Sequence, residues 1–332
     1  MKKLSKRVIS VLLAGIMIFG LGACGKSGAN DAANRDALLV RVVALRKAGR
    51  NADARLAAEN ALELWPLFHA VHRETEILQG GDGTKWRQGV RGEFPEESFL
   101  EAGDWYAESG LYEDAEECWR AAGDSPIAKL RLGEYAIAEA LPVPRLFPYR
   151  REDVSCLERA LSVRPSWKFK YYRAVLAASF QDDQWADELL ESCGNEPDDA
   201  AFYLFRARRK SGKARLADIL LAKKKGGGWR VYRDMAAFYA ECGDWANSAL
   251  AAETGLKRSP NCNALQIAYA RALNGCGRWR DTVKLLEGVD ILPSEFGDNA
   301  CDLWQEAWKN LGDEKMAATY PENLGKGAPY RR

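Results

Sequence analysis

The two histidines of the sequence are the first residues whose chemistry could support a reaction. His69 and His72 lie three residues apart and Glu76 follows one turn later, so a helix would place them on one side. Imidazole and carboxylate groups are ligands for zinc or nickel. No third histidine, CxxC pair or GxSxG motif accompanies them in the sequence. We therefore expect no metal site, no cofactor, no catalytic residue and no enzyme activity.

A second candidate is a phosphate-binding loop, because residues 20–27 match the pattern GxxxxGK(S/T). Such a loop needs a helix that starts at the lysine, so that backbone N–H groups face the phosphates. The next residues, 28–34, are small and polar, and no alternation of strands and helices follows. We therefore expect no nucleotide binding.

The amino-terminal segment predicts an export signal. Lys2, Lys3, Lys6 and Arg7 precede the apolar residues 8–20, and this run is too short to span a membrane. Without these four cations, 44 of the 48 basic residues remain against 47 acidic ones, a balance of −3 that gives no field for nucleic acid.

The end of this segment, Leu-Gly-Ala-Cys24, resembles the lipobox of bacterial lipoproteins. The resemblance implies cleavage after residue 23, lipidation of Cys24 with fatty chains such as palmitate, and attachment to a membrane. Residues 24–34 are then a lipidated, flexible tether.

Seven cysteines remain besides Cys24, and an odd number cannot all pair. They occur singly at small-residue positions of expected helices, where a thiol acts as a compact apolar side chain. We expect mostly free thiols, and one or two disulfides remain as an alternative. They are Cys118, Cys156, Cys193, Cys242, Cys262, Cys276 and Cys301.

From residue 36 onward, apolar residues recur at spacings of three and four residues, which predicts helices throughout and little sheet. The helices also repeat. In residues 229–260, large and small apolar residues, a turn glycine and a closing proline recur at fixed positions, carried by Tyr232, Ala236, Gly243, Ser248 and Pro260. Similar copies begin near residues 35, 96, 198, 263 and 298.

This pattern resembles the 34-residue tetratricopeptide repeat. The resemblance implies an all-α fold, an α-solenoid of stacked antiparallel helix pairs with about seven to eight hairpins. We expect repeats over residues 35–141 and 153–320, a proline-rich loop over 142–152 and a tail over 321–332. The register stays open at 67–94 and 142–197.

In tetratricopeptide proteins, the second, fifth, ninth and twelfth positions of the first helix commonly face the ligand. Carried over to this sequence, the resemblance predicts a basic and partly aromatic groove. Its residues are Phe202, Arg206, Arg209, Arg230, Arg233, Ile267 and Arg271. A guanidinium group donates two parallel hydrogen bonds to a carboxylate, so this groove suits an acidic segment or a C-terminal carboxylate.

Together these features predict a non-enzymatic, membrane-anchored adaptor that binds a protein or peptide partner in a tetratricopeptide-like groove, with a role in envelope assembly. The alternatives are a carbohydrate-binding surface lipoprotein and an accessory subunit of a peptidoglycan enzyme. The expected location is the cell envelope, on the periplasmic or surface side. Gly25 after Cys24 favours the outer membrane by the enterobacterial sorting pattern.

Overall fold

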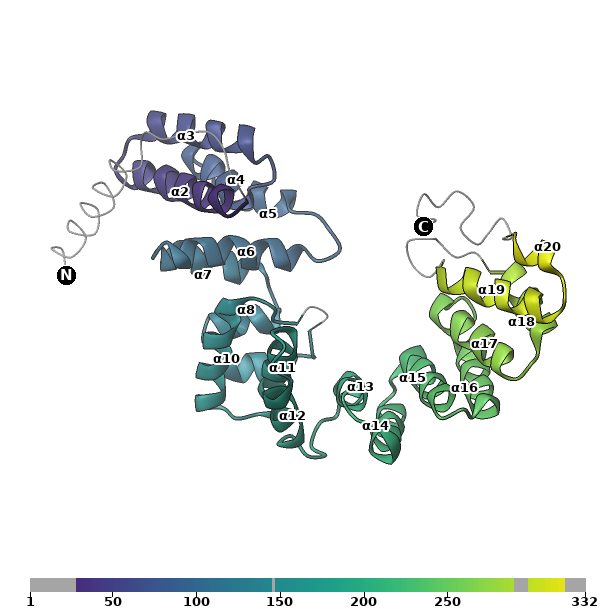
Figure 1. Ribbon diagram of the computed structural model, residues 1–332. Helices are drawn as coiled ribbons and strands as arrows, with labels where there is room; N and C mark the ends of the chain where they lie inside the picture. Colours follow the sequence, from purple (N-terminus) through teal and green to yellow (C-terminus); the bar gives the residue numbers. More distant parts are fainter. Residues whose placement is uncertain (1–27, 145–146, 290–297, 320–332) are drawn as a thin grey trace. The chain divides into compact units, whose positions relative to one another are not determined.

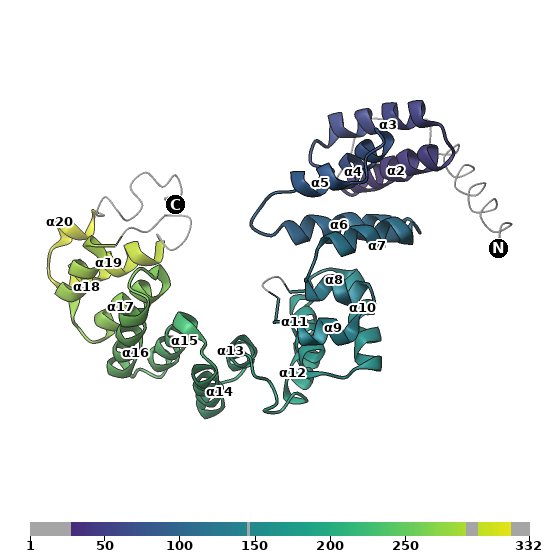
Figure 2. The same ribbon diagram turned by 180° about the vertical axis from the view of Figure 1, so that it is seen from behind.

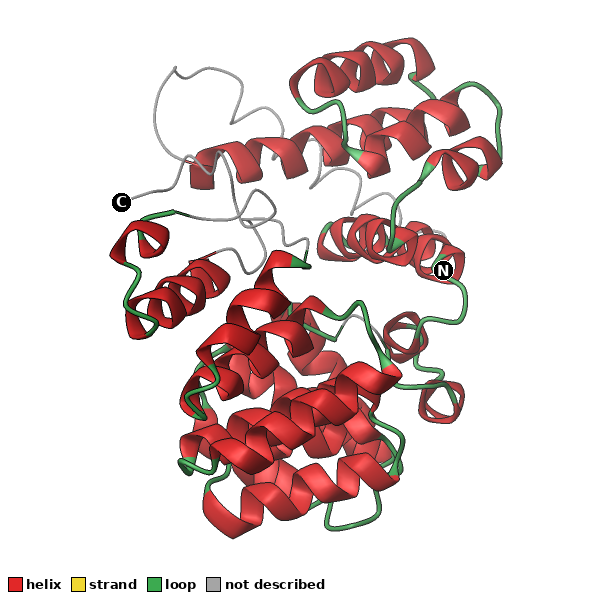
Figure 3. Cartoon of the chain, turned by 90° about the vertical axis from the view of Figure 1, so that its right-hand side faces the viewer, coloured by secondary structure: helices red, strands yellow, loops and turns green. Residues whose placement is uncertain are grey.

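The computed structural model describes residues 28–144, 147–289 and 298–319, which contain 19 helices and no strand (Figure 3). The all-α prediction is confirmed for this part of the chain. The contacts divide the chain into two compact units, residues 1–180 and 181–332, and each is described by itself. The signal segment, the lipobox and Cys24 lie outside the described residues, as does the expected tail.

The first unit consists of helices that pack as antiparallel pairs, with α2 against α3 and α6 against α7 (Figure 1). Its helices are α2 (Gly28–Lys47), α3 (Asn51–Leu64), α4 (His69–Leu78), α5 (Thr84–Gly89), α6 (Pro95–Glu108), α7 (Tyr112–Ala121), α8 (Pro126–Arg131), α9 (Tyr135–Ala140), α10 (Arg151–Val163) and α11 (Trp167–Ser179).

The second unit repeats this arrangement more regularly, with the pairs α13/α14, α15/α16 and α17/α18 in series (Figure 2). Its helices are α12 (Asp183–Glu191), α13 (Ala200–Arg208), α14 (Gly212–Lys224), α15 (Gly228–Glu241), α16 (Trp245–Arg258), α17 (Asn263–Gly275), α18 (Trp279–Glu287), α19 (Asp298–Asn310) and α20 (Glu314–Ala317). Each pair contacts the next, as expected for a solenoid.

The turn glycines explain why the helices end where they do. Gly243 has φ +74° and Gly277 has φ +71°, in the left-handed region that disfavours other residues. In both turns the next residue closes the helix, since Asp244 N–H donates to Tyr239 O at 2.9 Å and Arg278 N–H to Leu273 O at 2.9 Å. The same geometry recurs at the other predicted turn glycines 49, 110 and 312.

Small residues let the paired helices approach closely. A Cβ atom on Gly103 of α6 would lie 2.3 Å from the Trp119 indole nitrogen of α7. In the second unit, the Ser248 hydroxyl donates to Ala236 O at 2.8 Å, and Thr282 donates to Ala270 O at 3.3 Å. Each bond lies within one repeat, and the two bonds occupy equivalent positions in successive repeats. The repeat register predicted there therefore agrees with the packing.

The structure differs from the expected organisation at two places. Helix α2 begins at Gly28, so the latter part of the expected tether is helical. Helix α2 thus starts directly after the phosphate-loop motif, which itself lies outside the described residues, and the absence of nucleotide binding stays a prediction. The proline-rich loop lies inside the first unit, which extends to Phe180, and its last two residues begin α10.

None of the helices in the described part of the chain combines the length and apolar character needed to span a bilayer. Among the cysteines, Cys118 and Cys193 are buried as expected for apolar packing, whereas Cys242 and Cys276 are exposed. The thiol state in solution stays a prediction.

Candidate functional site

The second unit has a groove between α15 and α17, which we call the α15/α17 groove. Its volume is 250 Å³, and both helices line it with small side chains, namely Ala236, Ala237 and Ala240 of α15 and Ala264 and Ala268 of α17. Ala236 belongs to the repeat signature, where close helix packing requires a small residue. On the sides of α15 and α17 that face the groove, the small side chains leave its volume open.

Three of the predicted binding residues meet at this groove. Arg233, Ile267 and Arg271 all line it, from α15 and α17. Ile267 is 7% exposed and belongs to the core cluster with Val283 and Leu286, so it forms a fixed apolar wall. Arg271 is exposed and has no hydrogen-bond, ion-pair or ring partner among the described residues. Its guanidinium is therefore available at the rim.

Arg233 and Arg230 are held by the first turns of α15. Arg233 donates from Nε and Nη2 to Asp234 Oδ1 at 2.9 and 2.8 Å. Both guanidinium groups lie against the Trp229 ring, at 4.7 Å for Arg230 and 5.3 Å for Arg233. Arg230 is exposed but does not line the groove, so it contributes charge near the site.

The α13 part of the predicted strip has a different role. Phe202 is fully buried, and Arg206 is 5% exposed. The Arg206 guanidinium donates to both oxygens of Asp218 on α14, at 2.9 and 2.7 Å, and to Gly194 O at 2.8 Å. Burial alone would lower the Arg206 pKa, but the bonds to Asp218 raise it. These donors are already used, so Phe202 and Arg206 are core residues.

Arg209 lies just after α13 and is also engaged. Its Nη2 atom donates to the Asp183 carboxylate and carbonyl at 2.9 Å, and its Nε atom donates to Asp187. These contacts fasten α13 to α12. The residue is half-buried, and its guanidinium faces carboxylates of its own chain.

Sequence reasoning missed Asp234, which organises the basic face. It is 6% exposed and receives hydrogen bonds from Arg233 and from Arg208 of α13, the latter at 3.1 Å. Arg208 and Asp234 are 26 residues apart, so no local pattern joins them. Only the repeat period, which places α13 beside α15, could have indicated from the sequence that Arg208 and Asp234 meet.

The two histidines do not form a site with Glu76. The Glu76 carboxylate accepts from the backbone N–H groups of Lys85 at 3.0 Å and Trp86 at 2.6 Å, so it caps α5. His72 Nε2 contacts Pro66 O at 2.7 Å. Burial and the neighbouring His72 lower the pKa of His69. No three His, Cys, Asp or Glu side chains converge as a metal site anywhere in the described ranges.

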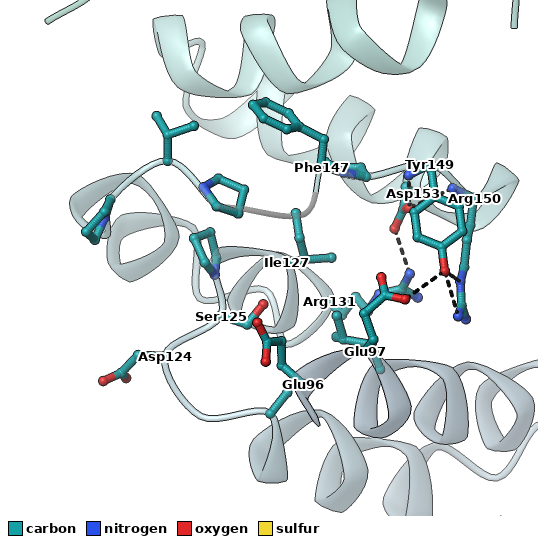
Figure 4. Close-up of a pocket in the computed structure, with 17 residues that line it drawn as sticks. Glu96, Glu97, Asp124, Ser125, Ile127, Arg131, Phe147, Tyr149, Arg150 and Asp153 are labelled. Carbon is teal, nitrogen blue, oxygen red and sulfur yellow. Dashed lines mark hydrogen bonds and ion pairs between the residues drawn. The ribbon is translucent and has the colours of Figure 1, made fainter. Parts of the chain in front are cut away.

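The first unit has a larger cavity of 390 Å³, which we call the α6/α8 recess (Figure 4). Its floor and side contain Leu100 of α6, Ile127 of α8 and three prolines of the loop before α10. Glu96 and Glu97 of the first turn of α6 stand at its edge, as Figure 4 shows. This recess was not predicted from the sequence.

Two arginines below the recess hold two buried carboxylates. Arg150 Nη1 donates to Asp104 Oδ2 at 2.9 Å, and Arg131 donates to Asp104 and, at 2.6 Å, to Asp153. Burial raises the pKa of Asp104 to about 6, although both arginines oppose the shift. The cations of this site are thus neutralised by the chain itself.

Two aromatic residues, Phe147 and Tyr149, line the α6/α8 recess, and none lines the α15/α17 groove. Trp86, Trp105, Trp119 and Trp304 are buried in the helix packing. These four rings are therefore unavailable for stacking on a sugar.

Solved structures similar to this chain contain tetratricopeptide repeats. Yeast Tom70 matches at 14% identity and a TM-score of 0.42, over 95% of this chain and 65% of Tom70. A tetratricopeptide repeat protein from Parabacteroides merdae matches at 14% identity and a TM-score of 0.31, over 72% of this chain and 99% of that protein. The Cut9–Hcn1 hetero-tetramer of APC/C matches at 12% identity and a TM-score of 0.35, over 85% of this chain and 54% of the matched chain.

No protein-family model and no curated protein sequence matches the chain. With identities of 12–14% and TM-scores below 0.5, the tetratricopeptide-like description rests on the helix pairs and turn glycines of the chain itself.

Proposed function

We propose that this chain is a non-enzymatic adaptor that binds an acidic segment or a C-terminal carboxylate of a protein partner in the α15/α17 groove. The observation that carries the proposal is Arg271, an exposed guanidinium without a partner in the described residues, at the rim of an alanine-lined groove. Helix α17 has no acidic residue, so nothing on that helix competes for it.

The groove suits a peptide because its walls and rim offer different contacts. The alanines admit the backbone of an extended segment, and Ile267 supplies an apolar contact. The guanidinium of Arg271 has the planar donor geometry that carboxylates bind. Arg230 and Arg233 add positive charge, which favours encounter with an acidic partner.

The groove is tested by the affinity of a fluorescein-labelled acidic peptide with a free C-terminus, measured by fluorescence anisotropy. Arg271→Glu should raise Kd by about tenfold or more, because it places a carboxylate against the peptide's own charge. The matched control is Arg280→Glu, since Arg280 is exposed in the same unit but does not line the groove. An equal loss in both variants, or no loss in Arg271→Glu, would contradict the groove assignment.

We further propose that Cys24 carries the lipid anchor and that the adaptor works at the cell envelope, with the outer membrane favoured. Support comes from the residues Leu-Gly-Ala-Cys24 and the basic and apolar run before them. Mass spectrometry of the purified protein should find an acylated N-terminal Cys24, and Cys24→Ser should move the protein from the detergent phase to the aqueous phase. An intact residue Met1 in the mature protein would refute this.

A further inference from the structure

The α6/α8 recess lies between three elements of the first unit. The first turn of α6 forms one edge, the start of α8 forms the floor, and the loop that leads into α10 forms the opposite wall (Figure 4). Its 390 Å³ is large enough for one or two side chains of a partner, although too small for a folded element.

The described walls of the recess are mainly apolar. Leu100 and Ile127 are 8% and 6% exposed, so they are fixed by the core. Pro144 and Pro148 lie along the loop wall, and Phe147 packs edge-to-face on Tyr171 at 5.1 Å. Proline has a fixed φ angle, so Pro144 and Pro148 have little backbone freedom to lose when a ligand binds.

Three carboxylates of the described residues, those of Glu96, Glu97 and Asp124, line the edge of the recess. Glu96 and Asp124 have no hydrogen-bond or ion-pair partner among the described residues, and Glu97 accepts a single hydrogen bond, from the Tyr149 hydroxyl at 3.1 Å. In Figure 4 the Glu96 side chain points towards the open space, and Asp124 lies at the outer margin. The recess therefore presents carboxylates to an occupant.

The cations beneath the recess do not balance these carboxylates. Arg131 binds Asp104 and Asp153, and Arg150 binds Asp104 and the Tyr149 hydroxyl. The Arg131 side chain is 4% exposed, and its Nε atom is buried without a hydrogen-bond partner in the described residues. The Arg131 guanidinium is therefore closed off from an occupant of the recess.

We propose that the α6/α8 recess is a second binding site, which takes an extended segment of a protein partner with a lysine or arginine beside an apolar residue. The apolar side chain lies against Ile127, Leu100 and the prolines, and the cation reaches Glu96 and Asp124. A cation brought to an apolar surface needs a counter-charge, and these two carboxylates are the groups without one. The proposal is independent of the α15/α17 groove, whose charge is opposite.

The test uses the full chain and a fluorescein-labelled peptide, Gly-Pro-Leu-Lys-Pro-Leu-Lys-Gly, with the same peptide carrying Glu in place of Lys as reference. The lysine peptide should bind saturably, and its Kd should rise by about fivefold or more in the double variant Glu96→Gln, Asp124→Asn. Its binding should also weaken with salt, since the edge is exposed. The control is Glu113→Gln, an exposed carboxylate of α7 that does not line the recess.

A second variant separates recognition from damage to the fold. Replacing Glu96 and Asp124 by lysine should reverse the preference, so that the variant gains binding of the glutamate peptide at this site, which unfolding cannot produce. The proposal is overturned if the lysine peptide shows no saturable binding at millimolar concentration. It is also overturned if the neutral double variant binds as the wild type does, or if the lysine double variant shows no reversal.

Discussion

The α6/α8 recess and the α15/α17 groove use the same side-chain types in opposite ways. Below the recess, Arg131 and Arg150 form ion pairs with Asp104 and Asp153, whereas the carboxylates of Glu96 and Asp124 have no partner among the described residues. At the groove, it is the guanidinium of Arg271 that lacks a partner in the described part of the chain. The difference shows that the charge offered to a partner is set by which side chains lack an internal partner, and composition does not reveal it.

The two units also differ in how they bury ion pairs. In the first unit, Glu74 is fully buried and accepts from Arg46 on α2, Arg73 on its own helix and Tyr106 on α6, the last at 2.7 Å. In the second, the buried Arg206 has a single bidentate carboxylate, Asp218. The larger network joins three helices, so its loss should be felt across the first unit.

The largest expected effect is therefore on stability, at Glu74. Glu74→Ala should lower the free energy of unfolding of the first unit by about 3–5 kcal/mol, because it removes the buried acceptor that Arg46 and Tyr106 share and leaves Arg46 only its longer bond to Asp114. Urea unfolding followed by circular dichroism would measure it. The exposed Glu113→Ala should change the value by less than about 0.5 kcal/mol. Equal losses at both positions would contradict a special role for the network.

The different roles of buried and exposed arginines can be tested within the second unit. Arg206→Ala should also cost about 3–5 kcal/mol, because Asp218 would stay buried without its main partner, whereas Arg271→Ala should stay within about 0.5 kcal/mol. Among variants that remain folded, Arg271→Ala should weaken binding of the acidic peptide more than Arg206→Ala does. If Arg271→Ala destabilised the unit as much as Arg206→Ala, Arg271 would be a packing residue.

Asp104 should make the free energy of unfolding depend on pH by up to about 3 kcal/mol, because its pKa in the folded state is raised from 3.8 to about 6. The folded state takes up the proton at higher pH than the unfolded state does, so this contribution to stability grows as pH falls through 6 and is complete below 3.8. Comparing the free energies of unfolding of wild type and Asp104→Asn between pH 7.5 and 4.5 isolates it. A difference that is constant with pH would show that Asp104 titrates normally.

The smallest effect on stability concerns helix approach. Gly103→Ala adds a Cβ atom that would lie 2.3 Å from the Trp119 indole and 3.1 Å from Ala115 O, so the Trp119 ring or helix α7 must shift. The expected loss is about 1–2 kcal/mol, since overpacking outweighs the gain of about 1 kcal/mol in helix propensity. Thermal unfolding would detect it. An unchanged or raised midpoint would mean that the pair is looser than its packing indicates.

The sequence predicted most of the helices and their turns because these depend on local rules. Gly243 and Gly277 stand where a helix must end with positive φ, and a 34-residue period brings Arg233, Ile267 and Arg271 together. The burial of Phe202 and Arg206 was not predicted, and for Arg206 it depends on Asp218 and Gly194, each twelve residues away in sequence.

The α6/α8 recess escaped prediction for another reason. One wall is a proline-rich loop, whose course follows no period, and the floor comes from short helix α8. The prolines indicated a loop but not what it packs against. The lack of partners for Glu96 becomes visible only when the surrounding helices are in place.

The central claim is that two cavities of opposite charge bind peptides of opposite charge. Isoleucine methyl NMR of the full chain tests it directly, because Ile127 lines the recess and Ile267 lines the groove. The acidic peptide should shift the Ile267 methyl signal and the lysine peptide the Ile127 signal, with Ile137 and Ile219 unmoved by either. Shifts of the same methyl by both peptides, or of neither methyl at saturating peptide, would contradict the claim.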